Sequence, residues 1–251
     1  MAFARMTVLL LVTALTSTPS LAGEVHVAVA ANFAAPMKSL VLEFERESGH
    51  RALVSLGATG QLYTQIRQGA PFGVLLAADA TTPSKLASDG YALAETQRTY
   101  AIGRLLLWSR DADYVDAKGD VLRRRDFRRL AIANPKLAPY GAAATQTLSA
   151  LGLREKLRSK IVEGANINQT FKFVASGNAE LGFVATSQIM QEGRLKSGSA
   201  WLVPANLHDP IRQDAILLTK GQDNPAAVAL LHYLDSRSAR DIIRRYGYEL
   251  P

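Results

Sequence analysis

Four turns in the sequence combine small or polar residues with the start of a helix, and together they could bind an anion. Asn32, Thr59, Tyr140 and Ile167 each stand where a short β-rich run ends and a helix begins. A helix N-terminus directs unpaired backbone N–H groups outward and carries the positive end of the helix dipole. Such a turn can therefore accept an anion without a lysine or an arginine. Asn32 and Thr59 are expected to add side-chain donors.

The composition of these turns selects the kind of anion. None of the four contains a cation or a carboxylate. A fully deprotonated oxyanion carries only acceptors, so a pocket of donors satisfies it. A protonated oxyanion such as hydrogen phosphate also needs an acceptor, and a buried donor without a partner is costly. Molybdate, tungstate and sulfate meet this condition, and pocket size would separate sulfate from the two larger anions.

Each turn taken alone also has an ordinary structural explanation. Asn and Thr are common helix N-caps, and small residues end strands in many α/β proteins. Four such turns in two similar halves of the chain favour a shared binding site over four unrelated caps.

Other chemistries have weaker support. The four histidines are scattered, no pair of them has metal-ligand spacing, and there is no cysteine for thiol catalysis or a thiolate metal site. Neither a Gly-x-Ser-x-Gly elbow nor a Walker loop occurs. Asp79 follows a predicted strand without an evident catalytic partner, so we expect it to cap a helix or to contact the other lobe. We expect no enzymatic activity, no directly bound metal ion and no cofactor.

The elements that must position the turns alternate between short strands and helices. Strands are predicted at 25–29, 52–56, 74–78, 130–133, 160–162 and 181–184. This alternation is typical of parallel sheets with crossover helices. In such sheets ligands bind outside the carboxyl ends of the strands, where the four turns lie.

Two segments interrupt the alternation. Residues 100–109 form a long extended run, 210–219 are its expected pairing partner, and a helical ending at 225–246 should dock on the first lobe. We therefore predict an α/β fold of two lobes, each a mostly parallel sheet flanked by helices, with two hinge strands and the ligand in the cleft. The predicted boundaries are residues 23–103 plus 208–251 for lobe 1 and 104–207 for lobe 2.

The first residues predict export. Arg5 precedes an apolar run at 8–15, and Ser20-Leu21-Ala22 supplies small residues at the two positions that a signal peptidase reads. The apolar run is shorter than the ~20 residues needed to span a bilayer. We predict a signal peptide at 1–22 and a periplasmic mature protein.

The net charge is +7, and the arginine-rich run at 123–129 has no interleaved aromatic platform. It is expected to be a solvated face, with no nucleic-acid partner.

Short motifs along the chain resemble the family of periplasmic molybdate-binding proteins of ABC transporters. Their order and spacing carry the resemblance more than any single piece. The motifs are Val29-Ala30-Ala31-Asn32-Phe33, Gly69-Ala70-Pro71, Ala77-Ala78-Asp79, Tyr100-Ala101-Ile102-Gly103, Asn134-Pro135, Ala138-Pro139-Tyr140-Gly141, Ala175-Ser176-Gly177, Leu181-Gly182-Phe183-Val184 and Tyr246-Gly247-Tyr248.

The resemblance implies a type II periplasmic solute-binding fold whose lobes close on one tetrahedral anion held by neutral donors. By position it implies ligand contacts from Asn32, from the hydroxyl and N–H of Thr59, and from the backbone N–H groups of Tyr140 and Ile167, with Ala31 as a further candidate. It also implies a monomer that binds molybdate, and tungstate with it, and delivers the anion to an ABC transporter permease.

The chain departs from the family pattern at three positions. Ala58-Thr59 replaces the usual Ser-Ser pair, Ala31 replaces a threonine, and Ala185 replaces a ligand tyrosine. These departures lower the number of side-chain donors to the anion. Two contributions from Tyr140 stay open, its phenol and its backbone N–H.

Three alternatives remain at this level. The first is a binding protein for another ligand such as sulfate or an organic acid, although an organic acid usually calls for an arginine clamp, which the four turns lack. The second is an α/β enzyme, which would need a nucleophile and a base that converge on the cleft. The third is the sensor half of a transcription regulator, which would carry a DNA-binding helix-turn-helix in place of the export signal.

Overall fold

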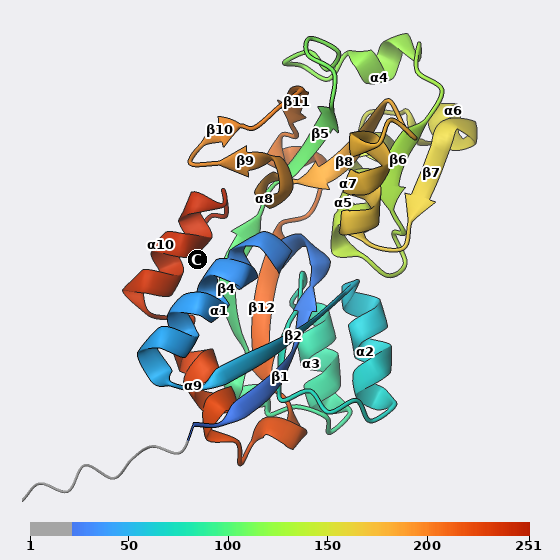
Figure 1. The fold of residues 1–251 in the computed structure, drawn as a ribbon. Helices are drawn as coiled ribbons and strands as arrows, with labels where there is room; N and C mark the ends of the chain where they lie inside the picture. Colours follow the sequence, from blue (N-terminus) through green and yellow to red (C-terminus); the bar gives the residue numbers. More distant parts are fainter. Residues whose placement is uncertain (1–21) are drawn as a thin grey trace, which may run out of the picture.

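Two five-stranded sheets, each flanked by helices, form two lobes in the computed structural model, which describes residues 22–251 (Figure 1). The predicted signal peptide lies outside the described residues except for Ala22. Within residues 22–251 no helix has the length and apolar character that crossing a membrane requires.

The sheet of the first lobe has the strand order β2-β1-β3-β12-β4. Strands β1 (Glu24–Ala30), β2 (Arg51–Gly57) and β3 (Val74–Leu76) are parallel. Strand β12 (Ile211–Leu217) runs antiparallel between β3 and β4 (Arg98–Gly103). These pairings leave β12 as the one strand of this sheet that opposes the other four.

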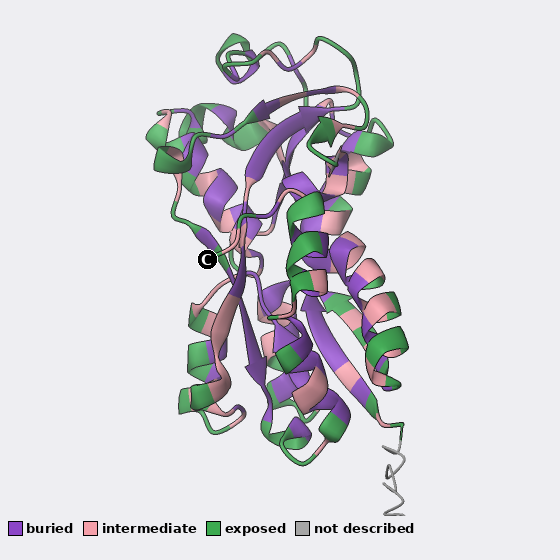
Figure 2. Cartoon of the chain, turned by 90° about the vertical axis from the view of Figure 1, so that its left-hand side faces the viewer, coloured by how far each residue is buried: buried purple, intermediate pink, exposed green. Residues whose placement is uncertain are grey.

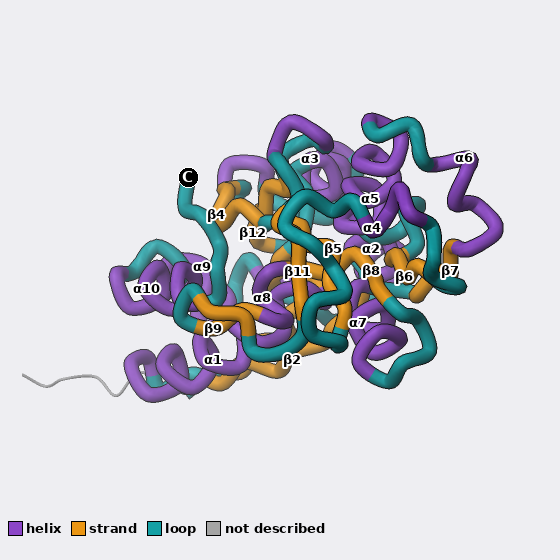
Figure 3. Tube along the Cα trace, turned by 90° about the horizontal axis from the view of Figure 1, so that it is seen from above, coloured by secondary structure: helices purple, strands orange, loops and turns teal. Residues whose placement is uncertain are grey.

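The sheet of the second lobe repeats this plan with the order β11-β5-β8-β6-β7, which can be followed from above in Figure 3. Strands β6 (Leu130–Ala133), β7 (Ile161–Gly164) and β8 (Leu181–Ala185) are parallel. Strand β5 (Leu105–Ser109) runs antiparallel between β8 and β11 (Ser199–Leu202). The predicted α/β fold with two mostly parallel sheets is confirmed.

The chain crosses between the lobes at Arg104, because β4 ends at Gly103 in one sheet and β5 begins at Leu105 in the other. The extended run predicted at 100–109 is therefore two strands. Its predicted pairing is confirmed, since β12 pairs antiparallel with β4, with Ile211 opposite Gly103. The residue-level lobe boundaries stay a prediction.

Helices cover both faces of each sheet, with buried residues toward the sheet and exposed residues toward solvent (Figure 2). The first lobe carries α1 (Ala34–Ser48), α2 (Thr59–Arg67), α3 (Thr81–Ser88), α9 (Pro225–Tyr233) and α10 (Arg237–Arg245). The second lobe carries α4 (Val121–Arg124), α5 (Pro139–Ala150), α6 (Arg154–Leu157), α7 (Ile167–Ala175), α8 (Thr186–Ile189) and the hairpin of β9 (Met190–Gln191) and β10 (Arg194–Leu195). The sequence did not predict this hairpin or β11.

The helical ending docks on the first lobe as predicted, because α9 contacts β1 and β12. The helical ending predicted at 225–246 consists of two helices, α9 and α10. The hydroxyl oxygen of Ser236 accepts a hydrogen bond from the N–H of Ala239 (3.1 Å) and so caps α10. A capped N-terminus starts a new helix at this position.

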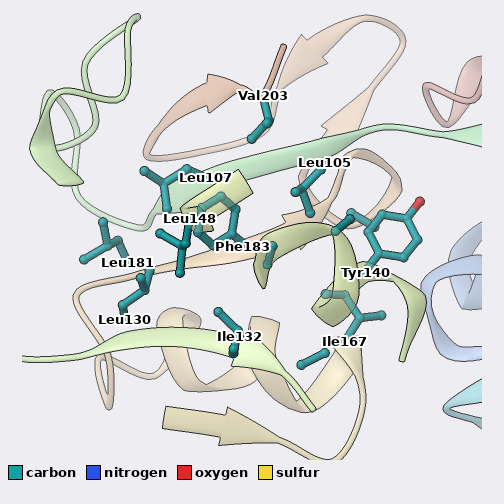
Figure 4. Close-up of a cluster of buried hydrophobic side chains, with 14 of the residues drawn as sticks. Leu105, Leu107, Leu130, Ile132, Tyr140, Leu148, Ile167, Leu181, Phe183 and Val203 are labelled. Carbon is teal, nitrogen blue, oxygen red and sulfur yellow. The ribbon is translucent and has the colours of Figure 1, made fainter. Parts of the chain in front are cut away.

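The core of the second lobe extends into the first. Tyr140 and Ile167 belong to a buried cluster with the leucines, isoleucine and phenylalanine of β5, β6 and β8 (Figure 4). The same cluster includes four alanines at or just after the carboxyl ends of strands in the first sheet, namely Ala30, Ala31, Ala58 and Ala78. Their small side chains let the two lobes approach closely at the place where the four turns meet.

Candidate anion-binding site

A small cavity lies between the lobes, and all the residues proposed from the sequence line it. Asn32, Thr59, Tyr140, Ile167 and Ala31 surround the cavity. The other lining residues are Ala30, Ala58, Ala78, Ala138, Pro139 and Asn166. The cavity has a volume of about 10 Å³. The lobes are thus closed on one another around this point.

The N-terminus of α7 presents one backbone donor. The side-chain oxygen of Asn166 accepts hydrogen bonds from the N–H groups of Asn168 (3.0 Å) and Gln169 (3.1 Å). The N–H of Thr170 donates to the Asn166 carbonyl (3.1 Å). Only the N–H of Ile167 in this first turn then lacks an acceptor among the described residues.

The N-terminus of α5 also presents one backbone donor, because its first residue is a proline. Its first residue, Pro139, has no N–H, and the N–H groups of Gly141 (2.8 Å) and Ala142 (3.1 Å) donate to the Ala138 carbonyl. The N–H of Tyr140 is left without an acceptor in the described part of the chain. Proline at the first helical position therefore isolates one donor beside the cavity.

Thr59, the first residue of α2, has two donors on the cavity. Its hydroxyl oxygen accepts the N–H of Ala78 (3.1 Å), which leaves the hydroxyl hydrogen free to donate. Its backbone N–H has no acceptor within residues 22–251, while the neighbouring N–H of Gly60 donates to the Leu137 carbonyl of the other lobe (2.9 Å). The side chain is buried, with 1% of its surface exposed.

Asn32 contributes differently from the prediction. Its side-chain nitrogen donates to Gln213 Oε1 (2.7 Å) and to Tyr248 Oη (2.9 Å), so both amide hydrogens already have partners and the geometry disfavours the side-chain donor expected from the sequence. The backbone N–H groups of Ala31 and Asn32 follow the end of β1 and have no acceptor among the described residues. Asn32 therefore offers the cavity its backbone N–H. Ala31 lacks the hydroxyl of the threonine in the family pattern and also offers only its backbone N–H.

The phenol of Tyr140 points away from Ile167 (Figure 4) and lies against Gly103, where a Cβ atom would overlap it. Its oxygen is buried and has no hydrogen-bond partner among the described residues. Burial raises the pKa of this phenol well above its usual value, and the neighbouring Tyr248 acts in the same direction. Of the two contributions left open by the sequence, the geometry favours the backbone N–H.

None of the described residues that line the cavity has a charged side chain. Asp79 instead lines a larger adjoining cleft of about 510 Å³. Its carboxylate accepts the N–H of Thr82 (2.6 Å) in the first turn of α3, one residue before the N-cap Ala80, so of the two roles expected for Asp79 the geometry favours the bond to a helix start. Burial raises the pKa of Asp79, and the nearby Asp214 adds to this despite the hydrogen bonds from Thr82. The cavity thus offers donors from four helix N-termini and one hydroxyl, a set suited to a fully deprotonated anion.

Several residues at this site escaped the sequence analysis. The capping role of Asn166 could have been read from its place before the predicted helix. Ser187, Gln213 and Tyr248, which contact Asn32, gave no usable signal because they lie 155 to 216 residues from it along the chain.

Known proteins share this architecture. Residues 25–249 match the family model described as bacterial extracellular solute-binding protein. The chain is 57% identical over 229 residues to the molybdate-binding protein ModA of Azotobacter vinelandii, covering 91% of each protein. It is 49% identical to the ModA protein of Rhodobacter capsulatus, covering 92% of this chain and 90% of that one.

A solved structure agrees with these matches. The Azotobacter vinelandii periplasmic molybdate-binding protein superposes with a TM-score of 0.88 at 40% identity, covering 90% of this chain and 99% of that one. The resemblance found in the sequence motifs is confirmed. The chain belongs to the family of bacterial extracellular solute-binding proteins.

Proposed function

We propose that this protein binds molybdate in the periplasm and delivers it to the permease of an ABC transporter. The observation that carries the proposal is the cavity between the two lobes, whose described lining holds unpaired N–H donors and no charged side chain. Thr59, Tyr140 and Ile167 each place beside it an N–H that has no acceptor among the described residues, and none of the described lining residues carries a carboxylate. The named molybdate-binding relatives support the choice of ligand.

Tungstate is proposed as a second ligand, since it has the same charge and shape as molybdate. Sulfate also satisfies a donor-only cavity, so only the size of the closed site discriminates against it. Hydrogen phosphate is disfavoured because none of the described lining residues supplies a carboxylate to accept its proton. We propose that the protein acts as a monomer with a single anion site.

Calorimetric titration of the mature protein with molybdate, tungstate, sulfate and phosphate tests the proposal. We expect one-to-one binding of molybdate and tungstate and far weaker binding of sulfate. Equal affinities for sulfate and molybdate would overturn the assignment of the ligand.

The proposed export has its own test. Residues 1–22 should be absent from protein recovered from the periplasm, because Ser20-Leu21-Ala22 supplies the cleavage site. N-terminal sequencing that still reads Met1 would contradict this.

A further inference from the structure

A buried hydrogen-bond network joins the two lobes beside the cavity. Ser187, in α8 of the second lobe, donates from Oγ to the backbone carbonyl of Asn32 in the first lobe (2.7 Å). Tyr248 Oη lies 3.0 Å from the same carbonyl oxygen and 3.2 Å from Ser187 Oγ. The network therefore converges on a residue whose N–H lines the cavity.

The network is closed to water. Ser187 has 1% of its surface exposed, and Asn32, Gln213 and Tyr248 are buried with it. Hydrogen bonds in such surroundings are stronger than in water, and polar groups that lose their partners there are penalised. A tyrosine phenol is already a neutral donor at physiological pH, and burial raises the pKa of Tyr248 further, to about 12.

Only one member of the network would separate when the lobes open. Asn32, Gln213 and Tyr248 all belong to the first lobe, from η1 (Ala31–Phe33), β12 and the C-terminal segment, and their mutual bonds do not cross the cleft. Among the described members of this network, only Ser187 reaches across from the second lobe. Its bond to Asn32 is thus specific to the closed state.

We propose that Ser187 is a positioning residue that latches the closed lobes and so sets how slowly the bound anion leaves. This rests on the proposed molybdate binding. A bond that exists only in the closed state shifts the open–closed equilibrium toward closure. Removal of that bond should increase the rate of ligand escape and leave the diffusive encounter with the open protein unchanged.

The first test is the dissociation rate of radiolabelled molybdate, chased with unlabelled anion, from wild type and Ser187→Ala. We expect dissociation to be about five- to tenfold faster in the variant, which corresponds to the loss of one ordinary hydrogen bond, with the association rate little changed. The ratio of molybdate to sulfate affinity should stay the same, because Ser187 does not line the cavity.

Ser109→Ala is the matched control. Ser109 is also fully buried, and its Oγ donates to the backbone carbonyl of Glu180 (2.6 Å) within the second lobe. This variant should lower the thermal stability but leave the dissociation rate unchanged. If both variants release molybdate equally fast, or if neither differs from wild type, the latch is overturned.

A ligand-free readout separates the latch from the ligand assignment. The chain has no cysteine, so spin labels at Ser88→Cys on α3 and Ser149→Cys on α5, both exposed, report the distance between the lobes. Without ligand, Ser187→Ala should shift this distance distribution toward longer values. An unchanged distribution would refute the latch, whereas failure of wild type to bind molybdate would refute only the proposed ligand.

Discussion

The hydroxyl oxygen of Thr59 accepts the N–H of Ala78 at 3.1 Å, although these residues come from different βα turns of the first lobe. Both line the cavity. The bond holds the threonine side chain in place and leaves its hydrogen as a donor. The Thr59 hydroxyl is thus preorganised to donate a hydrogen bond to an anion.

Substitution Thr59→Val should weaken molybdate binding about ten- to a hundredfold. Valine keeps the shape of threonine and removes a hydrogen bond to a charged ligand, which contributes about 1.5–3 kcal/mol. Calorimetry measures the change. Thr59→Ser retains the hydroxyl and should bind nearly as wild type, and Ile167→Ala retains its backbone N–H and should lose little affinity once folding is verified by circular dichroism. Undiminished affinity in Thr59→Val would mean that Thr59 is only structural.

Substitution Tyr140→Phe should change the molybdate affinity less than about threefold. The phenol oxygen lies against Gly103 without a partner among the described residues, so its removal takes nothing from the cavity. Thermal stability should be equal to that of wild type or higher, because a buried hydroxyl without a partner is unfavourable. A tenfold or larger loss of affinity would instead show that the phenol contacts the anion.

Substitution Asn166→Asp should keep the N-terminal cap of α7 and add a negative charge beside the bound anion. Aspartate caps a helix about as well as asparagine, so the ligand-free melting temperature should hold. The new negative charge lines the cavity beside a dianion, and such repulsion costs several kcal/mol at an effective dielectric constant of ~20. The dissociation constant for molybdate should therefore rise by at least about a hundredfold.

Asn224→Asp is the control for this charge change. Asn224 caps α9 by accepting the N–H of Ala226 (2.9 Å), and its side chain also contacts Glu24 at the start of β1, the opposite end of the strand from the cavity. This variant should bind molybdate as wild type does. Similar losses of molybdate affinity in both variants would indicate an effect of the protein's net charge and not of a charge beside the anion.

The stability of the protein should fall between about pH 10 and pH 12. Burial raises the pKa of Tyr248 from its ordinary value near 10 to about 12. A group with a raised folded-state pKa stabilises the fold fully below its unfolded pKa, and this contribution is lost as pH rises through the folded value. Chemical unfolding at a series of pH values should show that Tyr248→Phe loses less stability than wild type over this range, by a difference on the order of 2 kcal/mol, since other buried tyrosines contribute to both proteins alike. A pH-independent difference between the two proteins would contradict this assignment.

Local patterns determined much of the fold. Apolar runs such as 130–133 and 181–184 predicted strands at nearly their observed bounds, because a strand covered on both faces must be apolar along its length. Thr59, Tyr140 and Ile167 were placed at strand-to-helix turns by spacing alone. Parallel strands bring such turns to one edge of each sheet, so their meeting at one cavity followed from the order of the elements.

Only the tertiary structure decided which atoms face that cavity. The side-chain nitrogen of Asn32 is taken by Gln213 and Tyr248, and the phenol of Tyr140 is turned toward Gly103. These partners lie far away along the chain, and hydrogen bonds between distant residues have no periodicity that a sequence could reveal. The sequence by itself therefore determined the kind of site, a set of neutral donors at helix N-termini. The contact of Ser187 with Asn32, and the choice of backbone over side chain at two of the donors, depended on how the two lobes pack together.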